Sequence, residues 1–149
     1  PSYSMPAQSL SLALMEERSV PCRVAGKDYP MALTLRAAKA ITERFGELEA
    51  LGDKLRTAPF GEQLDMVLWL LSLLMAEGCA QENFLHPEQP QLTPPTQEIL
   101  ELFFTPGDLV GLRNVIFRCM TVGLGREVQT EDDGKNPEAG QETASSMPG

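Results

Sequence analysis

The sequence predicts a mainly α-helical protein of about five helices with a short N-terminal β-hairpin, in a single domain with a disordered acidic C-terminal tail. Two observations support this fold class. Between residues 19 and 34, apolar residues recur at every second position on both sides of a turn, which is the period of a β-strand. In several later segments apolar residues recur three or four positions apart, which is the period of an α-helix.

The two ends of the chain differ in composition from its middle. Residues 1–18 mix apolar and polar residues and are predicted to form a flexible arm, although its stretch 9–15, SLSLALM, is apolar enough for a strand or a helical turn. Residues 127–149 contain six acidic residues and one lysine, so they carry −5 of the net charge of −9. Such a polar segment buries too little apolar surface to offset its ordering entropy, so we expect it to be disordered. A helical domain over residues 19–126 remains.

The predicted hairpin turns at Gly26-Lys27, because glycine at the first central position suits a tight turn. This turn sets three facing pairs: Val24 with Tyr29, Cys22 with Met31, and Val20 with Leu33. Pro21 and Pro30 would then both lie where the partner strand expects an amide donor, which proline lacks. We therefore expect a hairpin that is short, bulged or at a sheet edge.

The first helix follows directly, with Thr34 placed to cap it and Gly46 placed to close it. Its predicted apolar stripe consists of Leu35, Ala38, Ile41 and Phe45. The apolar pattern continues to residue 56 but is interrupted by Gly46 and Gly52, which predicts two helices or one kinked helix.

The C-terminal part of the domain is predicted to contain two helices after a proline-rich connector over residues 84–96. A short helix at 96–104 places Ile99, Leu102 and Phe103 on one face. The last helix begins near Pro106, a residue that suits a first turn. Its predicted buried stripe consists of Leu109, Leu112, Ile116, Cys119 and Met120.

Residues 64–76, LDMVLWLLSLLMA, form a helix that is apolar on nearly every side. The segment is shorter than the roughly twenty apolar residues of a membrane span, so no membrane association is expected. Two interpretations stay open: a central core helix, or a helix with one side exposed in the monomer and buried against another chain. On the second interpretation the partner-binding residues are Leu64, Val67, Leu68, Trp69, Leu71, Leu74 and Met75.

The sequence carries no recognisable catalytic pattern, so we expect no enzyme, no cofactor and no metal. His86 is the only histidine, and a zinc site from Cys79, His86 and Cys119 would lack a fourth ligand. The three cysteines, which include Cys22, lack C-x-x-C spacing and are predicted to be free thiols in a reducing compartment. The net charge of −9 argues against nucleic-acid binding.

Residues 23–46, RVAGKDYPMALTLRAAKAITERFG, resemble the N-terminal signature of tail assembly chaperones from long-tailed (siphovirus-like) phages and prophages. That signature is a short strand, a tight turn, an aromatic residue, a Leu/Thr-Leu step and a helix ending in Phe-Gly. The matching residues are Gly26-Lys27, Tyr29, Leu33-Thr34-Leu35, Ala37-Ala38, Ile41 and Phe45-Gly46.

The resemblance implies a non-enzymatic chaperone that binds the tape measure protein and helps to recruit tail tube subunits. It also implies action in the host cell cytoplasm, self-association into a homo-oligomer and absence from the finished virion. A longer frameshift product is a further expectation, with a slip site in the codons of residues 134–136. Two alternatives stay open: a structural virion component, such as a head–tail connector or tail completion protein, and a small acidic regulator of a cellular protein.

Overall fold

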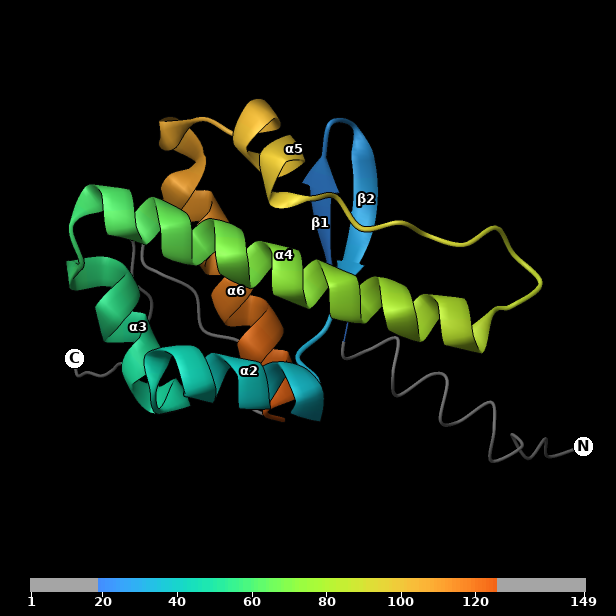
Figure 1. Cartoon of the computed structure of the whole chain (residues 1–149), viewed down its shortest axis with the longest axis horizontal. Helices are drawn as coiled ribbons and strands as arrows, with labels where there is room; N and C mark the ends of the chain where they lie inside the picture. Colours follow the sequence, from blue (N-terminus) through green and yellow to red (C-terminus); the bar gives the residue numbers. More distant parts are fainter. Residues whose placement is uncertain (1–18, 126–149) are drawn as a thin grey trace, which may run out of the picture.

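The computed structural model describes residues 19–125, which form five α-helices and one two-stranded antiparallel hairpin (Figure 1). This arrangement confirms the predicted fold class, mainly helical with an N-terminal hairpin. The predictions for the arm (1–18) and for the acidic tail (127–149) concern residues outside the described range.

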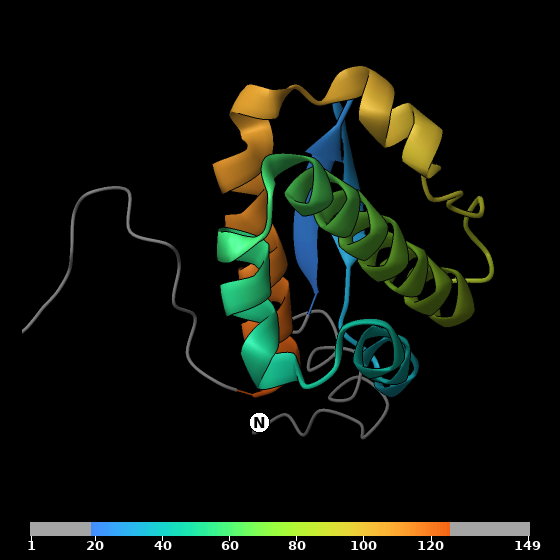
Figure 2. The same ribbon diagram turned by 60° about the vertical axis from the view of Figure 1, so that its left-hand side comes forward.

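The hairpin consists of β1 (Val20–Val24) and β2 (Lys27–Met31). The helical elements that follow are α2 (Leu35–Phe45), α3 (Leu48–Thr57), α4 (Phe60–Leu85), α5 (Gln97–Phe103), the short 3-10 turn η1 (Pro106–Asp108) and α6 (Leu109–Gly123). Helix α4 crosses the middle of the molecule, with α2 on one side of it and α5 on the other (Figure 1). The hairpin lies between α4 and α6, so that β2 contacts α4 and β1 contacts α6 (Figure 2).

The hairpin turns one residue earlier than predicted, at Ala25-Gly26, and the predicted pairing was wrong. The strand residues face each other as Val20 with Met31, Pro21 with Pro30, Cys22 with Tyr29, Arg23 with Asp28, and Val24 with Lys27. Both turn residues have positive φ, 52° for Ala25 and 81° for Gly26, as a type I′ turn requires. Hydrogen-bonded and non-hydrogen-bonded pairs alternate from the closing pair, so the two prolines face each other at a non-hydrogen-bonded pair. Neither proline therefore occupies a position where the partner strand requires an amide donor.

Ala25 is the one non-glycine residue with positive φ in the described part of the chain, and this conformation is unfavourable for an L-residue with a Cβ. We expect Ala25→Asn to raise the free energy of unfolding by about 1 kcal/mol, because asparagine adopts the left-handed region more readily. Thermal unfolding followed by circular dichroism would show an increase in Tm of a few degrees. An unchanged or lower Tm would contradict the turn geometry.

The first predicted helix is α2, and the apolar pattern that continues to residue 56 forms a second helix, α3, as one of the two predicted alternatives. The break lies at Gly46, where φ is 91°, whereas the predicted interruption at Gly52 was wrong because Gly52 lies inside α3. Thr34 caps α2 by accepting a hydrogen bond from the amide of Ala37 at 3.0 Å. The predicted apolar stripe was wrong at its first residue, because the buried residues of α2 are Ala37 and Ile41 while Leu35 is exposed. At about 100° per residue, Leu35 is turned by roughly 120° from the direction of Ile41 and does not face the core.

Helix α4 is twice as long as the predicted segment 64–76, with 26 residues. By length and composition it is the one helix among the described residues that could cross a membrane, which corrects the prediction that this segment is too short. The core helix of a soluble protein passes the same test, and 44% of the most apolar window of α4 is buried inside the fold. A single core cluster joins α4 to both strands and to the other helices.

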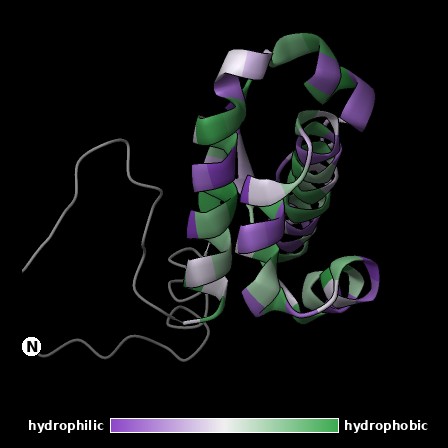
Figure 3. Ribbon diagram, turned by 90° about the vertical axis from the view of Figure 1, so that its left-hand side faces the viewer, coloured by the Kyte–Doolittle hydropathy of each residue, from purple (hydrophilic) through white to green (hydrophobic). Residues whose placement is uncertain are grey.

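Helix α6 has the predicted buried stripe: Leu109, Leu112, Ile116, Cys119 and Met120 are all buried. Figure 3 shows hydrophobic and hydrophilic stretches alternating along this helix, as expected when one side is buried. Helix α5 turns its predicted apolar face, which carries Ile99, Leu102 and Phe103, away from the core. Its buried residue is Leu100, while these three side chains are exposed.

The three cysteines are free and buried in the structure. Burial raises the pKa of Cys22 from 9.0 to about 11, with a smaller contribution from Asp28, and burial raises the pKa of Cys119 to about 12. The pKa of Cys79 is also raised, mainly by burial. At neutral pH these side chains are therefore protonated thiols, whereas the thiolate is the reactive form.

We expect the native protein to react with Ellman's reagent at pH 8 at least about a hundredfold more slowly than the protein in concentrated urea, where the thiol pKa returns to about 8.5. Fast reaction of one thiol per native chain would contradict the burial of all three.

The same pKa shifts should make the protein less stable above about pH 9, because the unfolded chain then releases thiol protons that the folded chain retains.

Candidate protein-binding groove

The structure divides the seven predicted partner-binding residues of α4 into two groups. Val67, Leu71, Leu74 and Met75 are buried in the core, and Leu64, Leu68 and Trp69 are partly buried and pack against it. The four buried side chains are not accessible to another protein in this structure. Of the seven predicted partner-binding residues, those that stay partly accessible are Leu64, Leu68 and Trp69.

Trp69 is largely occupied by contacts with the end of α2. Its ring meets Phe45 edge-on, with 5.4 Å between the ring centres. The guanidinium of Arg44 lies 4.8 Å from the centre of the Trp69 ring, in a cation–π contact. These contacts join α2 to the middle of α4 and leave little of the indole for a partner.

Leu64 and Leu68 line a small cavity of about 200 Å³ between α4, α5 and the start of α6. Its other walls include Leu100, Phe104 and Leu109. The volume is below the roughly 300 Å³ at which ligand pockets usually begin, so this cavity is too small for a large side-chain cluster of a partner.

A larger concave surface lies at the other end of α4. We call it the α2–α4 groove: residues 32–38 form one wall, residues 77–85 of α4 form the other, and Gly123 and Leu124 close it at the end of α6. Its volume is about 810 Å³. The lining is predominantly apolar, which is the usual composition of a surface that receives apolar groups.

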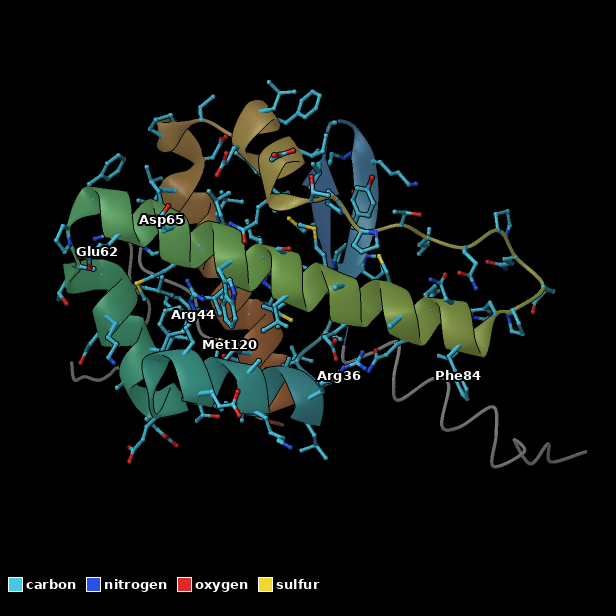
Figure 4. The ribbon with its side chains drawn as sticks, in the orientation of Figure 1. Arg36, Arg44, Glu62, Asp65, Phe84 and Met120 are labelled. Carbon is cyan, nitrogen blue, oxygen red and sulfur yellow. The ribbon has the colours of Figure 1, made fainter. Side chains whose placement is uncertain are left out.

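Two exposed apolar side chains stand at the edges of this groove. Leu35 at the start of α2 is 88% exposed, and Phe84 near the end of α4 is 84% exposed. Figure 4 shows Phe84 projecting from α4 on the side where Arg36 begins α2. Leu124, also exposed, adds a third apolar side chain. A partner that covers this groove would remove all three from water.

The charged residues of the groove lining, Arg36 and Glu77, pair with each other. The Nη2 atom of Arg36 lies 2.9 Å from Oε2 of Glu77, and its Nε donates to both carboxylate oxygens at 3.2 and 3.1 Å. The hydroxyl of Thr34 donates to Oε1 of Glu77. The hydrogen bonds and charge of Glu77 raise the pKa of Arg36 above its ordinary value, so Arg36 remains charged.

This polar network fixes the shape of the groove. Glu77 is buried, and Thr34 both caps α2 and bonds to this carboxylate, so the start of α2 is attached to the middle of α4. A buried carboxylate without such partners would be strongly unfavourable. The groove therefore presents apolar side chains at its edges and no unpaired charge in its wall.

Within residues 19–125, no group of three His, Cys, Asp or Glu side chains lies close enough to hold a metal ion. His86 lies beside Glu82 and Glu88, with nitrogen–oxygen distances of 3.7 and 3.6 Å. Glu82 lies near the end of α4, Glu88 follows the helix, and both carboxylates are at least partly exposed.

The sequence pattern did not single out the residues at the edges of the groove. Leu35 was assigned to the buried stripe of its helix, and Phe84 was assigned to the connector instead of to α4. An extension of the helix to Leu85 would have placed Phe84 on α4, but its exposure depends on the tertiary packing and carries no signal in the sequence. No known family model matches the chain, and no significant similarity to a curated protein or to a solved structure was found.

Proposed function

We propose that this chain is a non-enzymatic phage tail assembly chaperone that binds an apolar helix of the tape measure protein in the α2–α4 groove. The single observation that supports protein binding is this groove, whose edges expose Leu35 and Phe84 almost fully to water. The resemblance of residues 23–46 to tail assembly chaperones supplies the class of client. On this proposal the protein acts in the host cytoplasm and helps to recruit tail tube subunits.

The size and chemistry of the groove suit one face of an amphipathic helix. Helix-in-groove recognition places apolar side chains from successive turns into an apolar channel between two helices. Complete burial of a leucine or phenylalanine side chain contributes about 1.5–3 kcal/mol, so covering Leu35 and Phe84 would provide several kcal/mol toward binding. Because Arg36 and Glu77 already pair, the client needs no charge at the wall of the groove.

The charge of the whole chain fits the same role. A net charge of −9 disfavours self-precipitation and would help to keep a complex with an aggregation-prone client in solution. The resemblance to tail assembly chaperones also supports the expected homo-oligomer, for which the groove is not needed. A structural virion component remains the alternative proposal.

The test is co-expression with the tape measure protein encoded by the same phage or prophage. We expect the tape measure protein to be soluble with the wild-type chain and to aggregate with the Leu35→Asp, Phe84→Asp double variant. Phe60→Asp is the matched control, because Phe60 is also exposed on α4 but lies at its opposite end. The proposal fails if the tape measure protein stays soluble without this chain, or if the double variant protects it fully.

Mass spectrometry of finished particles separates the chaperone from the alternative. A chaperone should be absent from the particles, whereas a head–tail connector or tail completion protein should be present in a fixed number of copies. Detection of this chain in purified virions would therefore overturn the proposed role in favour of the structural one.

A further inference from the structure

The described chain begins beside the α2–α4 groove. Val20 faces Met31 at the open end of the hairpin, and the residues after Met31, numbers 32–38, form one wall of the groove. In an antiparallel pair the first residue of one strand and the last residue of the other lie at the same end, so Ser19 lies at the end of the hairpin from which residues 32–34 continue. Eighteen residues precede Ser19 in the sequence.

Those preceding residues include the segment 9–15, SLSLALM, which matches the chemistry of the groove. It contains no charged residue, and Leu10, Leu12 and Leu14 alternate with Ser9, Ser11 and Ala13. An extended segment of this pattern presents its three leucines on one side. The groove likewise has apolar edges and a single ion pair whose charges satisfy each other.

The length of chain between this segment and the hairpin is sufficient. Five residue steps separate Met15 from Val20, and an extended chain spans about 3.3–3.6 Å for each residue, so Met15 can lie up to about 17 Å from Val20. Gly78 of α4 is packed against Pro30, and Phe84 is six residues further along the helix, about 9 Å along its axis. The whole wall of the groove is therefore within reach of residues 9–15.

The other end of the chain is a poorer occupant. Leu124 lines the groove, so residues 126–149 also start near it. Residues 127–149 are acidic and contain almost no large apolar side chains, so they match the apolar edges of the groove poorly. The chemistry of the groove thus favours the N-terminal segment.

We propose that residues 9–15 bind in the α2–α4 groove of their own chain and cover Leu35 and Phe84 until a client displaces them. The short link to Val20 gives this segment a high effective concentration at the groove, of the order of millimolar, which a second copy reaches only at very high protein concentration. The segment therefore competes with a client for binding to the groove. Only its competition with a client rests on the function proposed above; its binding to the groove does not.

Paramagnetic relaxation enhancement on the full-length chain tests the contact. An Ala7→Cys variant can be spin-labelled selectively, because the three native thiols are buried. We expect strong broadening of the amide signals of Ala80, Phe84 and Leu124 at the groove. The signals of Asp53 and Gly61, at the other end of the fold, should be unaffected. Broadening at neither place, or equally at both, overturns the proposal.

Two matched substitutions show whether the leucines and the groove make the contact. Leu12→Asp in the labelled chain should abolish the broadening, while Ser11→Asp, one position away on the other side of the segment, should retain it. Phe84→Asp should abolish it, while Phe60→Asp should not. Retained broadening with both Leu12→Asp and Phe84→Asp overturns the proposal.

Mixing a spin-labelled chain with an isotope-labelled chain that carries no spin label distinguishes the same chain from a second copy. The proposal predicts no broadening of the isotope-labelled chain. Broadening there that increases with protein concentration would assign the groove to an arm from another copy and overturn binding within one chain.

A synthetic peptide of residues 7–17 tests the competition without any client. It should bind the Leu12→Asp chain at least about tenfold more tightly than the wild-type chain, because the wild-type groove is mostly occupied. Equal affinity for the two chains overturns the proposal. If the peptide and the label behave as expected but the tape measure protein is not protected, the proposed chaperone function fails and the intramolecular contact stands.

Discussion

Gly78→Ala is expected to lower the free energy of unfolding by about 3 kcal/mol. A Cβ at this position would lie 2.2 Å from the carbonyl oxygen of Pro30 and 2.8 Å from the amide nitrogen of Met31. Both atoms belong to the backbone of β2, so no side-chain rotation relieves the overlap and the strand must move away from α4. The movement would also disturb the hydrogen bond from the amide of Ala32 to the carbonyl of Leu74, which is 3.1 Å long. Urea unfolding followed by circular dichroism measures the loss.

Gly61→Ala is the matched control for this prediction. Gly61 lies on the same helix, and a Cβ there meets nothing within 4 Å. Alanine forms helix more readily than glycine by up to about 1 kcal/mol, so this variant should be as stable as the wild type or slightly more stable. If Gly78→Ala were as stable as Gly61→Ala, the close packing of β2 on α4 would be wrong.

The position of Gly78 explains how the fold creates the groove. The chain crosses α4 at this glycine, Ala32 is still hydrogen-bonded to Leu74, and the groove lies between the residues that follow and the end of α4. The buried Glu77 holds the start of α2 at that separation through Thr34 and Arg36. A variant that pushes β2 away from α4 should therefore also distort the groove.

Local patterns predicted the elements well because their causes are local. Strand alternation, the Thr34 cap and the Gly46 break each depend on a few neighbouring residues, and all three are present. The hairpin register was missed because Ala25 adopts positive φ in the turn. This conformation is unusual for alanine, so the sequence gives no sign that Ala25 is a turn residue. A prediction that first placed Pro21 opposite Pro30 would have found the register, because that pair needs no amide donor.

The groove could not be read from the sequence because it depends on contacts between distant residues. Glu77 looks like an ordinary surface acid in the sequence, and its burial follows from Thr34 and Arg36, about forty residues earlier. The apolar pattern of residues 64–76 gave a helix but not which of its sides the hairpin and α6 would cover. Period and composition predict that a helix is buried, while its remaining exposed side is set by the tertiary packing.

Leu71→Ala and Phe84→Ala should distinguish a core residue of α4 from a residue of its binding surface. Leu71 is completely buried, so its truncation leaves a cavity and should lower the free energy of unfolding by about 2–5 kcal/mol. Phe84 is 84% exposed in the described residues, so in the Leu12→Asp chain, whose N-terminal segment no longer covers it, its truncation should change stability by no more than about 0.5 kcal/mol. Urea unfolding of the two variants under identical conditions gives both values.

The binding measurements should show the opposite order. Phe84→Ala should weaken binding of the residue 7–17 peptide to the Leu12→Asp chain, because it removes the largest apolar side chain at the edge of the groove. Leu71→Ala should leave that affinity within about twofold under conditions where the variant is folded, since Leu71 does not line the groove.

If Leu71→Ala lowered the free energy of unfolding by less than about 1 kcal/mol, this side of α4 would not be packed as described. Truncation of a core leucine must lower the free energy of unfolding, so such a result would show that Leu71 is not a core residue. It would favour a binding surface on residues 64–76 over one in the groove.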